Sequence, residues 1–222
     1  MEGHSKEYCK KYEMNTVEFT LYGSVLDSAY TVLIERLRGL SDPKFEKFHE
    51  HELVFANSMK CLQLVIRLTS CSLENVKAGV INWHVRRSLD QPNAPYHVKY
   101  MGDNEADVNE KCPVNVRKVI NCLCTSNDMM AFLGDIGFRM QYEFVAKGIL
   151  FKKGPIKVTV SKIYRVIEAG NSSAVEKFTD SHLVEMSALS SFPEDPIANT
   201  IREFADQLKP IVNMEKMINK KQ

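Results

Sequence analysis

The residues best suited to hold a metal ion are six cysteines and two closely spaced histidines. Cys122 and Cys124 form the one closely spaced cysteine pair, and no second pair completes a site. Structural zinc needs about four ligands within tetrahedral reach. His49 and His51 are equally isolated along the sequence. The sequence therefore predicts no metal centre and no cofactor, and it indicates that the two histidines are solvated loop residues.

A second group with chemical potential is a set of basic residues in the stretch 137–168, which has the pattern of a long hairpin. Gly154-Pro155 suits a two-residue type II′ turn, because glycine supplies the positive φ that the turn requires. That turn places Lys147 opposite Lys162, and like charges in such a pair repel unless an anion or a carboxylate lies between them. The basic side chains form either a solvated outer face that touches an acidic partner or an anion-binding barrel interior. The set comprises Lys147, Lys152, Lys153, Lys157, Lys162 and Arg165.

Strands are the elements that must position these residues. Apolar residues alternate or cluster at 17–22, 52–56, 62–69, 81–89, 96–101 and 114–124. Many strands with few helices favour a mainly β chain, either an antiparallel sandwich or a closed barrel. In the long hairpin the apolar face switches sides at Gly148. A bulge or a bend there would carry the strand around the corner of a barrel, so the closed antiparallel barrel is favoured.

Helices are expected at the margins of the sheet, at 27–38, 127–136 and 196–208. The first would begin with Asp27 or Ser28 as its cap and end before Gly39. Its apolar arc exceeds the stripe of roughly 100° that a surface helix needs, because Tyr30 and Ile34 extend it sideways. Either a loop of the chain covers these two side chains or a partner binds them, which makes Tyr30 and Ile34 candidate partner-binding residues.

Charge and composition limit the remaining function classes. A net charge of +1 leaves no general basic excess of the kind that nucleic-acid binding requires, so no sequence-specific nucleic-acid contact is expected. No apolar run approaches the roughly 20 residues of a membrane span, and the polar N-terminus lacks a signal region. The expected organisation is a flexible tail at 1–15, one domain at 16–210 and a C-terminal tail at 211–222.

Three segments in order resemble the subunit 18 family of the Mediator complex, and the similarity runs from about Phe19 to Pro210. They are FTLYGSVLDSAYTVLIERLRGLSD, RRSLDQPNAPYHVKYMG and FLGDIGFRMQYEFVAKGILFKKGPIKVTVSKIYRV. The resemblance implies a closed β-barrel with flanking helices, related to tunnel-type RNA triphosphatases. It also implies a nuclear protein with two partners, Mediator subunit 20 and a C-terminal helix of subunit 8, and indirect contact with the RNA polymerase II machinery. Segments 1–15 and 70–82 do not match the family and are interpreted as an extension and an insertion.

The implied relation to triphosphatases raises the question whether this chain keeps the carboxylates that bind the catalytic metal ion. Tunnel-type triphosphatases bind a divalent metal ion through glutamates spaced two residues apart on a strand. This chain keeps one glutamate on each corresponding strand, namely Glu18, Glu143 and Glu185. A hard cation would therefore lack oxygen ligands, and no enzymatic activity is expected. The sequence favours a non-catalytic interaction subunit of the Mediator head module, a coactivator of transcription. The alternative is a tunnel-fold protein that binds triphosphate or RNA, as an active or degenerate triphosphatase.

Overall fold

The computed structural model describes residues 16–58, 80–104, 112–126, 128–193 and 196–217, and its strands form one antiparallel sheet. The strands are β1 (Thr16–Leu26), β2 (Phe45–Ser58), β3 (Val80–Ser88), β4 (Tyr96–Asn104), β5 (Asn115–Cys124), β6 (Arg139–Lys153), β7 (Ile156–Val166), β8 (Val175–Lys177) and β9 (Ser181–Ser190). The helices are η1 (Asp27–Ala29), α2 (Tyr30–Leu40), α5 (Met129–Asp135) and α6 (Ile197–Asp206). No helix in these ranges is long and apolar enough to cross a membrane.

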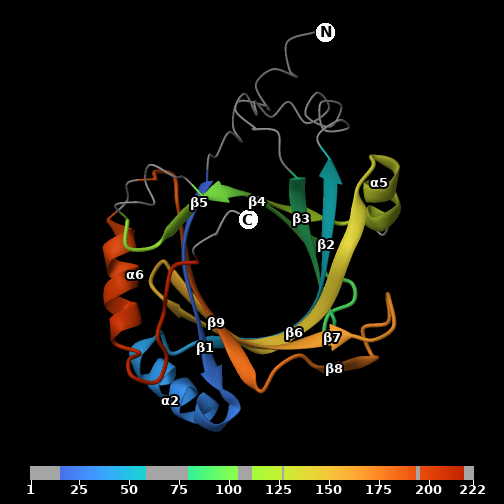
Figure 1. Cartoon of the computed structure of the whole chain (residues 1–222). Helices are drawn as coiled ribbons and strands as arrows, with labels where there is room; N and C mark the ends of the chain where they lie inside the picture. The colour runs from blue at the N-terminus through green and yellow to red at the C-terminus, as the bar shows by residue number, and fades with distance from the viewer. Residues whose placement is uncertain (1–15, 59–79, 105–111, 127, 194–195, 218–222) are drawn as a thin grey trace.

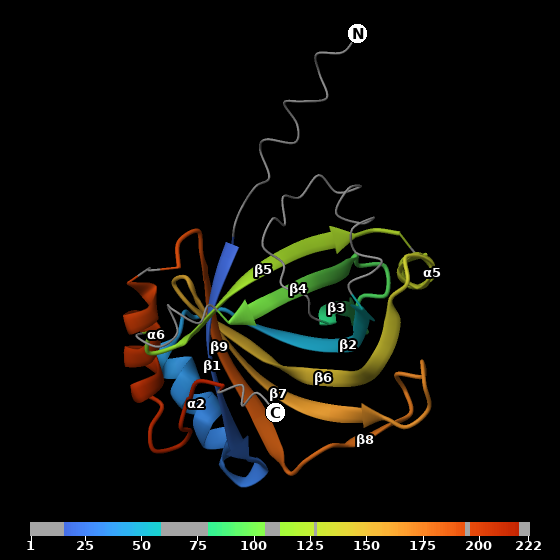
Figure 2. The ribbon, with the colours of Figure 1, turned by 45° about the horizontal axis from the view of Figure 1, so that its top comes forward.

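The sheet closes on itself. Its strand order is β6-β2-β3-β4-β5-β1-β9-β7-β8, and β6 also pairs with β7. Eight of the nine strands therefore form a ring, and β8 is attached outside it (Figures 1 and 2). The prediction of a closed antiparallel β-barrel with flanking helices is confirmed.

The apolar core lies on the outer surface of this barrel. Helices α2 and α6 cover the outer faces of β1, β7 and β9, where Phe19, Leu33 and Phe204 belong to one buried cluster (Figure 1). A second buried cluster joins Phe55 to Leu133 of α5. Because the apolar side chains of the strands point outward, the alternate side chains of the same strands point into the barrel and are largely polar.

Strand β2 is much longer than the strand expected at 52–56, extending over 14 residues from Phe45 to Ser58. That prediction was wrong because Lys47, His49 and His51 on the outward face of β2 are as polar as Glu50 and Glu52 on its inward face, so the sequence lacks apolar alternation. His49 and His51 consequently lie in this strand and not in a loop. The expected strand at 62–69, the segment 1–15 and most of the insertion at 70–82 lie outside the described residues.

Helix α2 has different ends from those predicted. Asp27 does not cap it, because the Asp27 carboxylate accepts hydrogen bonds from Lys162 Nζ at 2.6 and 2.7 Å. Gly39 lies inside the helix, which continues to Leu40, where Ser41 N donates to Leu37 O at 2.9 Å. Because Asp27 is engaged by Lys162 of β7, it does not cap the helix, and α2 begins at Tyr30, three residues after Asp27.

The long hairpin has the predicted register. Lys147 lies opposite Lys162, and Gly154 has a φ of +55° at the turn. The ladder between β6 and β7 is continuous, so the expected bulge at Gly148 does not form. A Cβ atom on Gly148 would lie 2.3 Å from Val160 O, which shows that the strands approach too closely there for any side chain. The structure thus shows a close approach of β6 and β7 at Gly148 in place of a bulge.

Candidate functional site in the barrel interior

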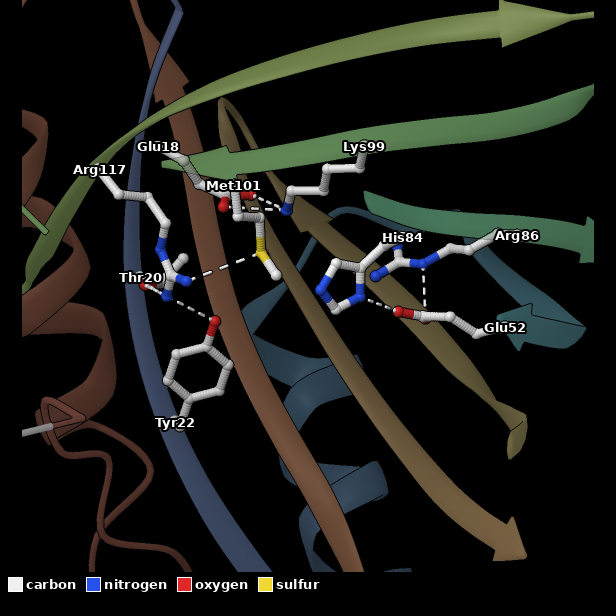
Figure 3. A network of polar contacts seen from close by, with 9 residues as sticks. All are labelled: Glu18, Thr20, Tyr22, Glu52, His84, Arg86, Lys99, Met101 and Arg117. Atoms are coloured by element: carbon white, nitrogen blue, oxygen red, sulfur yellow. Dashed lines mark hydrogen bonds and ion pairs between the residues drawn. The ribbon is translucent and has the colours of Figure 1, made fainter. Parts of the chain in front are cut away.

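The strand register brings opposite charges together inside the barrel. On β1 the inward residues Glu18, Thr20 and Tyr22 alternate with outward apolar ones. Glu18 lies opposite Arg117 of β5, and on the other side of the ring Glu52 of β2 lies opposite Arg86 of β3. Figure 3 shows these side chains pointing into the space that the strands enclose.

Glu18 and Lys99 form the most buried ion pair of this network. Lys99 Nζ donates to both carboxylate oxygens of Glu18, at 2.7 and 2.9 Å. The two side chains are 6% and 8% exposed, so water contributes little to their solvation. Glu18 is on β1 and Lys99 on β4, with β5 between them in the sheet. The pair therefore ties non-adjacent strands together across the inner face.

Glu52 is the centre of a second cluster. Its Oε1 lies 2.6 Å from His84 Nδ1, and its Oε2 accepts a hydrogen bond of 2.7 Å from Arg86 Nε. Burial of Glu52 opposes its ionisation, but the His84 hydrogen bond and the Arg86 charge outweigh burial and lower its pKa to about 2. This carboxylate is consequently charged and fully engaged at neutral pH.

The lowered pKa of Glu52 predicts a specific loss of stability in acid. A carboxyl group whose pKa is depressed by folding stabilises the protein above its unfolded pKa, near 4.5, and loses that contribution as pH falls toward 2. We expect Glu52→Gln to be less stable than the wild type at pH 7, with the difference shrinking between pH 4.5 and 2. Urea denaturation at several pH values measures this difference. A difference in stability between Glu52→Gln and the wild type that stays constant with pH would contradict the lowered pKa of Glu52.

Arg117 is held in the interior by neutral acceptors. Its Nη2 donates to Thr20 Oγ1 at 3.2 Å and to Tyr22 Oη at 3.0 Å, and its Nη1 approaches Met101 Sδ at 3.6 Å. Burial of Tyr22, and then the charge of Glu185, raise the tyrosine pKa to about 12, so the phenol stays protonated. The positions after Glu18 on β1 thus serve as acceptors for Arg117.

Formal charges in the middle of the barrel balance. Burial, and then the nearby Arg86 charge, lower the pKa of Lys157, while Glu185 and Glu50 act in the opposite direction. Near the middle of the strands, the inward acidic residues Glu18, Glu50, Glu52 and Glu185 are matched in number by Arg86, Lys99, Arg117 and Lys157. Lys152 and Glu46 lie on the same face and pair with each other. Two ion pairs within the chain, Glu18–Lys99 and Glu52–Arg86, stabilise this region, and the eight formal charges near the middle of the strands sum to zero. Within the described ranges no three His, Cys, Asp or Glu side chains are grouped as metal ligands.

The predicted basic residues of the hairpin do not share one surface. Lys147 and Lys162 lie on the outward face of the sheet, and Lys157 lies on the inward face. Four have contacts of their own: Lys152 pairs with Glu46, Lys153 lies over the ring of Phe204, Lys162 pairs with Asp27, and Arg165 pairs with Glu176. The positive charge counted along the sequence is therefore divided between two faces, and three of the six side chains are paired with carboxylates.

Glu143 points away from the interior. Its Oε2 lies 2.7 Å from His51 Nε2, and its Oε1 accepts a 2.7 Å hydrogen bond from Gly170 N. In the register of β2 and β6, Glu143 shares the outward face with Lys147. Of the three glutamates considered for metal binding, only Glu18 and Glu185 point inward, and Glu18 is paired with Lys99.

The structure places the two candidate partner-binding residues of α2 differently. Ile34 is 5% exposed and belongs to the main apolar cluster. Tyr30 is half-buried, with its ring stacked on His182 at a centroid distance of 4.1 Å. A different residue of α2, Val32, is 57% exposed. The chain itself covers most of the wide apolar arc seen in the sequence.

Sequence reasoning missed the interior network almost completely. His84 and Arg86 occupy alternate positions of one strand, and His97 and Lys99 occupy alternate positions of the next. Two neighbouring strands that each carry charges with a period of two are the signal that was available. It was not used because a face that carries charges is ordinarily interpreted as facing solvent.

Comparisons with known proteins agree on one family. The family model described as Med18 protein matches residues 17–218. A Xenopus tropicalis protein, Mediator of RNA polymerase II transcription subunit 18, is 38% identical over 205 residues, covering 92% of this chain and 90% of the relative. The Aedes aegypti protein of the same name is 40% identical over 200 residues, covering 90% and 84%.

Solved structures share the fold at low sequence identity. A chain of the Schizosaccharomyces pombe Mediator head module superposes with a TM-score of 0.64 at 10% identity, covering 90% of this chain and 98% of that one. A protein from Pyrococcus horikoshii reaches a TM-score of 0.56 at 12% identity, covering 90% and 94%. The barrel architecture is therefore found outside this family as well.

Proposed function

The chain belongs to the Med18 family of Mediator subunits, and from this premise we propose that it is a non-catalytic structural subunit of the Mediator head module. Its role would be to join other subunits within a coactivator that links transcription regulators to RNA polymerase II, inside the nucleus. The observation that carries the non-catalytic part is the pairing of the interior carboxylates Glu18 and Glu52 with cations of the chain itself.

Two partners are proposed on the same premise, Mediator subunit 20 and a C-terminal helix of subunit 8. Contact with the RNA polymerase II machinery would be indirect, through the assembled module. Neither membrane nor sequence-specific nucleic-acid binding forms part of the proposal. The net charge of +1 and the divided basic residues of the hairpin support that last point.

Co-assembly tests the structural role. Co-expression of this chain with subunits 20 and 8 of one species is expected to give a stable stoichiometric complex, measured by size-exclusion chromatography with light scattering. Subunit 8 lacking its C-terminal helix serves as the control, and it should drop out of the complex while subunit 20 remains. Elution of this chain alone, with correctly folded partners present, would contradict the proposal.

A phosphate-release assay distinguishes the alternative function, a tunnel-fold triphosphatase or triphosphate-binding protein. We expect no release from nucleoside or RNA 5′-triphosphates with Mn²⁺ or Mg²⁺, because Glu18 already binds Lys99 and Glu143 points outward. The matched control is Glu185→Gln, which removes an inward carboxylate for which no ion pair is seen. Metal-dependent release that disappears in this variant would establish the alternative.

A further inference from the structure

The barrel has a seam where β1 and β5 diverge. These strands pair only from Thr16 to Thr20 on β1, although β1 continues to Leu26. Beyond Thr20, none of the strands that the structure describes pairs with the edge of β1 that faces β5. An exposed strand edge is a template for pairing with another chain, so proteins usually cover it.

Residues 211–217, here called the strap, occupy this seam. Tyr22 N donates to Glu215 O at 3.0 Å, and Glu215 N donates to Tyr22 O at 2.7 Å, as in an antiparallel bridge. In the amide orientation that satisfies both groups, the Asn115 side chain donates to Met217 O at 3.3 Å and accepts from Met217 N at 2.8 Å. The strap thus joins both sides of the seam, and Figures 1 and 2 show it returning from α6 to β1.

The side chains of the strap alternate as those of a strand do. Val212 and Met214 are each 2% exposed and pack into the apolar cluster outside the barrel, whereas Asn213 and Glu215 are exposed. The sequence predicts a C-terminal tail at 211–222, but residues 211–217 pack against the barrel. The strap is held by the two buried side chains, by the backbone bridge at Glu215 and by the Asn115 contact with Met217. Two more hydrogen bonds hold it, from Arg202 Nη1 to Met214 O at 3.1 Å and from Lys216 Nζ to Cys112 O at 2.8 Å.

Gly23 is the point at which the strap crosses β1. A Cβ atom there would lie 2.7 Å from Asn213 O, 2.8 Å from Val212 Cγ2 and 2.9 Å from Met214 Sδ. Contacts that short require something to move, and the backbone of Asn213 cannot give way without lifting the strap. Glycine at this position, within the segment LYGS, is therefore explained by the strap and not by any need of β1 itself.

We propose that the seam is a strand-docking slot and that the strap is its occupant, bound as a detachable segment of the same chain. Detachment costs less free energy than unfolding, because two buried apolar residues and a few hydrogen bonds hold the strap, whereas β1 is paired with β9 at ten consecutive positions. The slot selects an extended segment with apolar side chains two residues apart and backbone directly over Gly23. The strap covers the edge of β1 and keeps it from pairing with other chains.

Gly23→Ala in the full chain tests the crossing point. The added methyl group is expected to release the strap, so that amide hydrogen exchange at Tyr22 and Glu215 accelerates by roughly tenfold or more, equivalent to about 1.4 kcal/mol. Fluorescence of Trp83, the one tryptophan, reports on the fold from the second apolar cluster and should not change. Gly39→Ala is the matched control, since a Cβ there meets nothing within 4 Å. Unchanged exchange in Gly23→Ala would overturn the proposal.

A second experiment tests whether the slot survives without its occupant. Val212→Asp/Met214→Asp in the full chain should free the strap while leaving Gly23 and the slot intact. A fluorescent peptide of residues 208–217 should then bind to this variant, measured by anisotropy, but not to the wild type or after a further Gly23→Val change. Loss of the Trp83 signal would show that the strap is inseparable from the core, and a folded variant that does not bind the peptide would show that no slot exists. Either result overturns the proposal.

Discussion

Replacing Lys99 by methionine is expected to lower the free energy of unfolding by about 3–5 kcal/mol, the typical cost of removing one partner of a buried ion pair. Lys99 is 8% exposed on its side chain, and its Nζ binds both oxygens of Glu18. Methionine matches the lysine stem in length, so the apolar packing is retained. The Glu18 carboxylate is then left buried without its cation. Urea denaturation at pH 7 measures the loss.

Two further variants separate the lost charge from other effects. In Glu18→Gln/Lys99→Met neither charge remains, so much of the stability should return. Lys152→Met breaks an ion pair with Glu46 whose side chains are 52% and 63% exposed, and such a surface pair is worth about 1 kcal/mol or less. Two results would contradict this. Lys99→Met could lower the free energy of unfolding no more than Lys152→Met does, or the double variant could be no more stable than Lys99→Met. Either would show that the buried Glu18–Lys99 pair does not stabilise the fold.

The long hairpin could be predicted from sequence because its signals are local. Gly154-Pro155 fixes a two-residue turn, the turn fixes the register of β6 on β7, and Lys147 therefore lies opposite Lys162 as expected. At Gly148 the face switch led to the expectation of a bulge or a bend, whereas the structure shows a close approach of the two strands. A face switch along one strand does not reveal whether an extra residue or a close approach of two strands causes it.

The interior could not be predicted, because alternation identifies two faces of a strand and not which of them points into a barrel. In this barrel the apolar face points outward under α2 and α6, which reverses the usual assignment. Strand β2 was predicted too short for a different reason, because His49 and His51 lie on its outward face and neither face of the strand carries an apolar pattern there.

Contacts between side chains on distant strands cannot be predicted from local sequence patterns. Glu18 and Lys99 are 81 residues apart and lie on strands that are not neighbours, so their contact depends on the curvature of the closed sheet. The ion pair between Asp27 and Lys162 also links distant segments, and it removed the predicted cap of α2. In both cases a tertiary contact decided the role of a residue whose local sequence suggested a different one.

Ile34→Ala is expected to lower the free energy of unfolding of the isolated chain by about 2–5 kcal/mol, the range for truncating a buried aliphatic side chain. Ile34 is 5% exposed and packs in the cluster that joins α2 to the outer face of the barrel. The neighbouring Val32→Ala is the matched control. Val32 is 57% exposed, so its truncation should change stability by no more than about 0.5 kcal/mol.

The same pair of variants decides between the two roles considered for the wide apolar arc of α2. If the chain itself uses Ile34 as core, thermal or urea melts of the isolated protein should show the large loss, and co-assembly with subunits 20 and 8 should weaken only as far as the fold does. If a partner covers this arc, Ile34→Ala should leave the melts nearly unchanged and reduce co-assembly directly. Because Ile34 packs against the barrel whereas Val32 faces outward, we expect the first result, and a partner on this helix would have to contact Val32 and the exposed part of Tyr30.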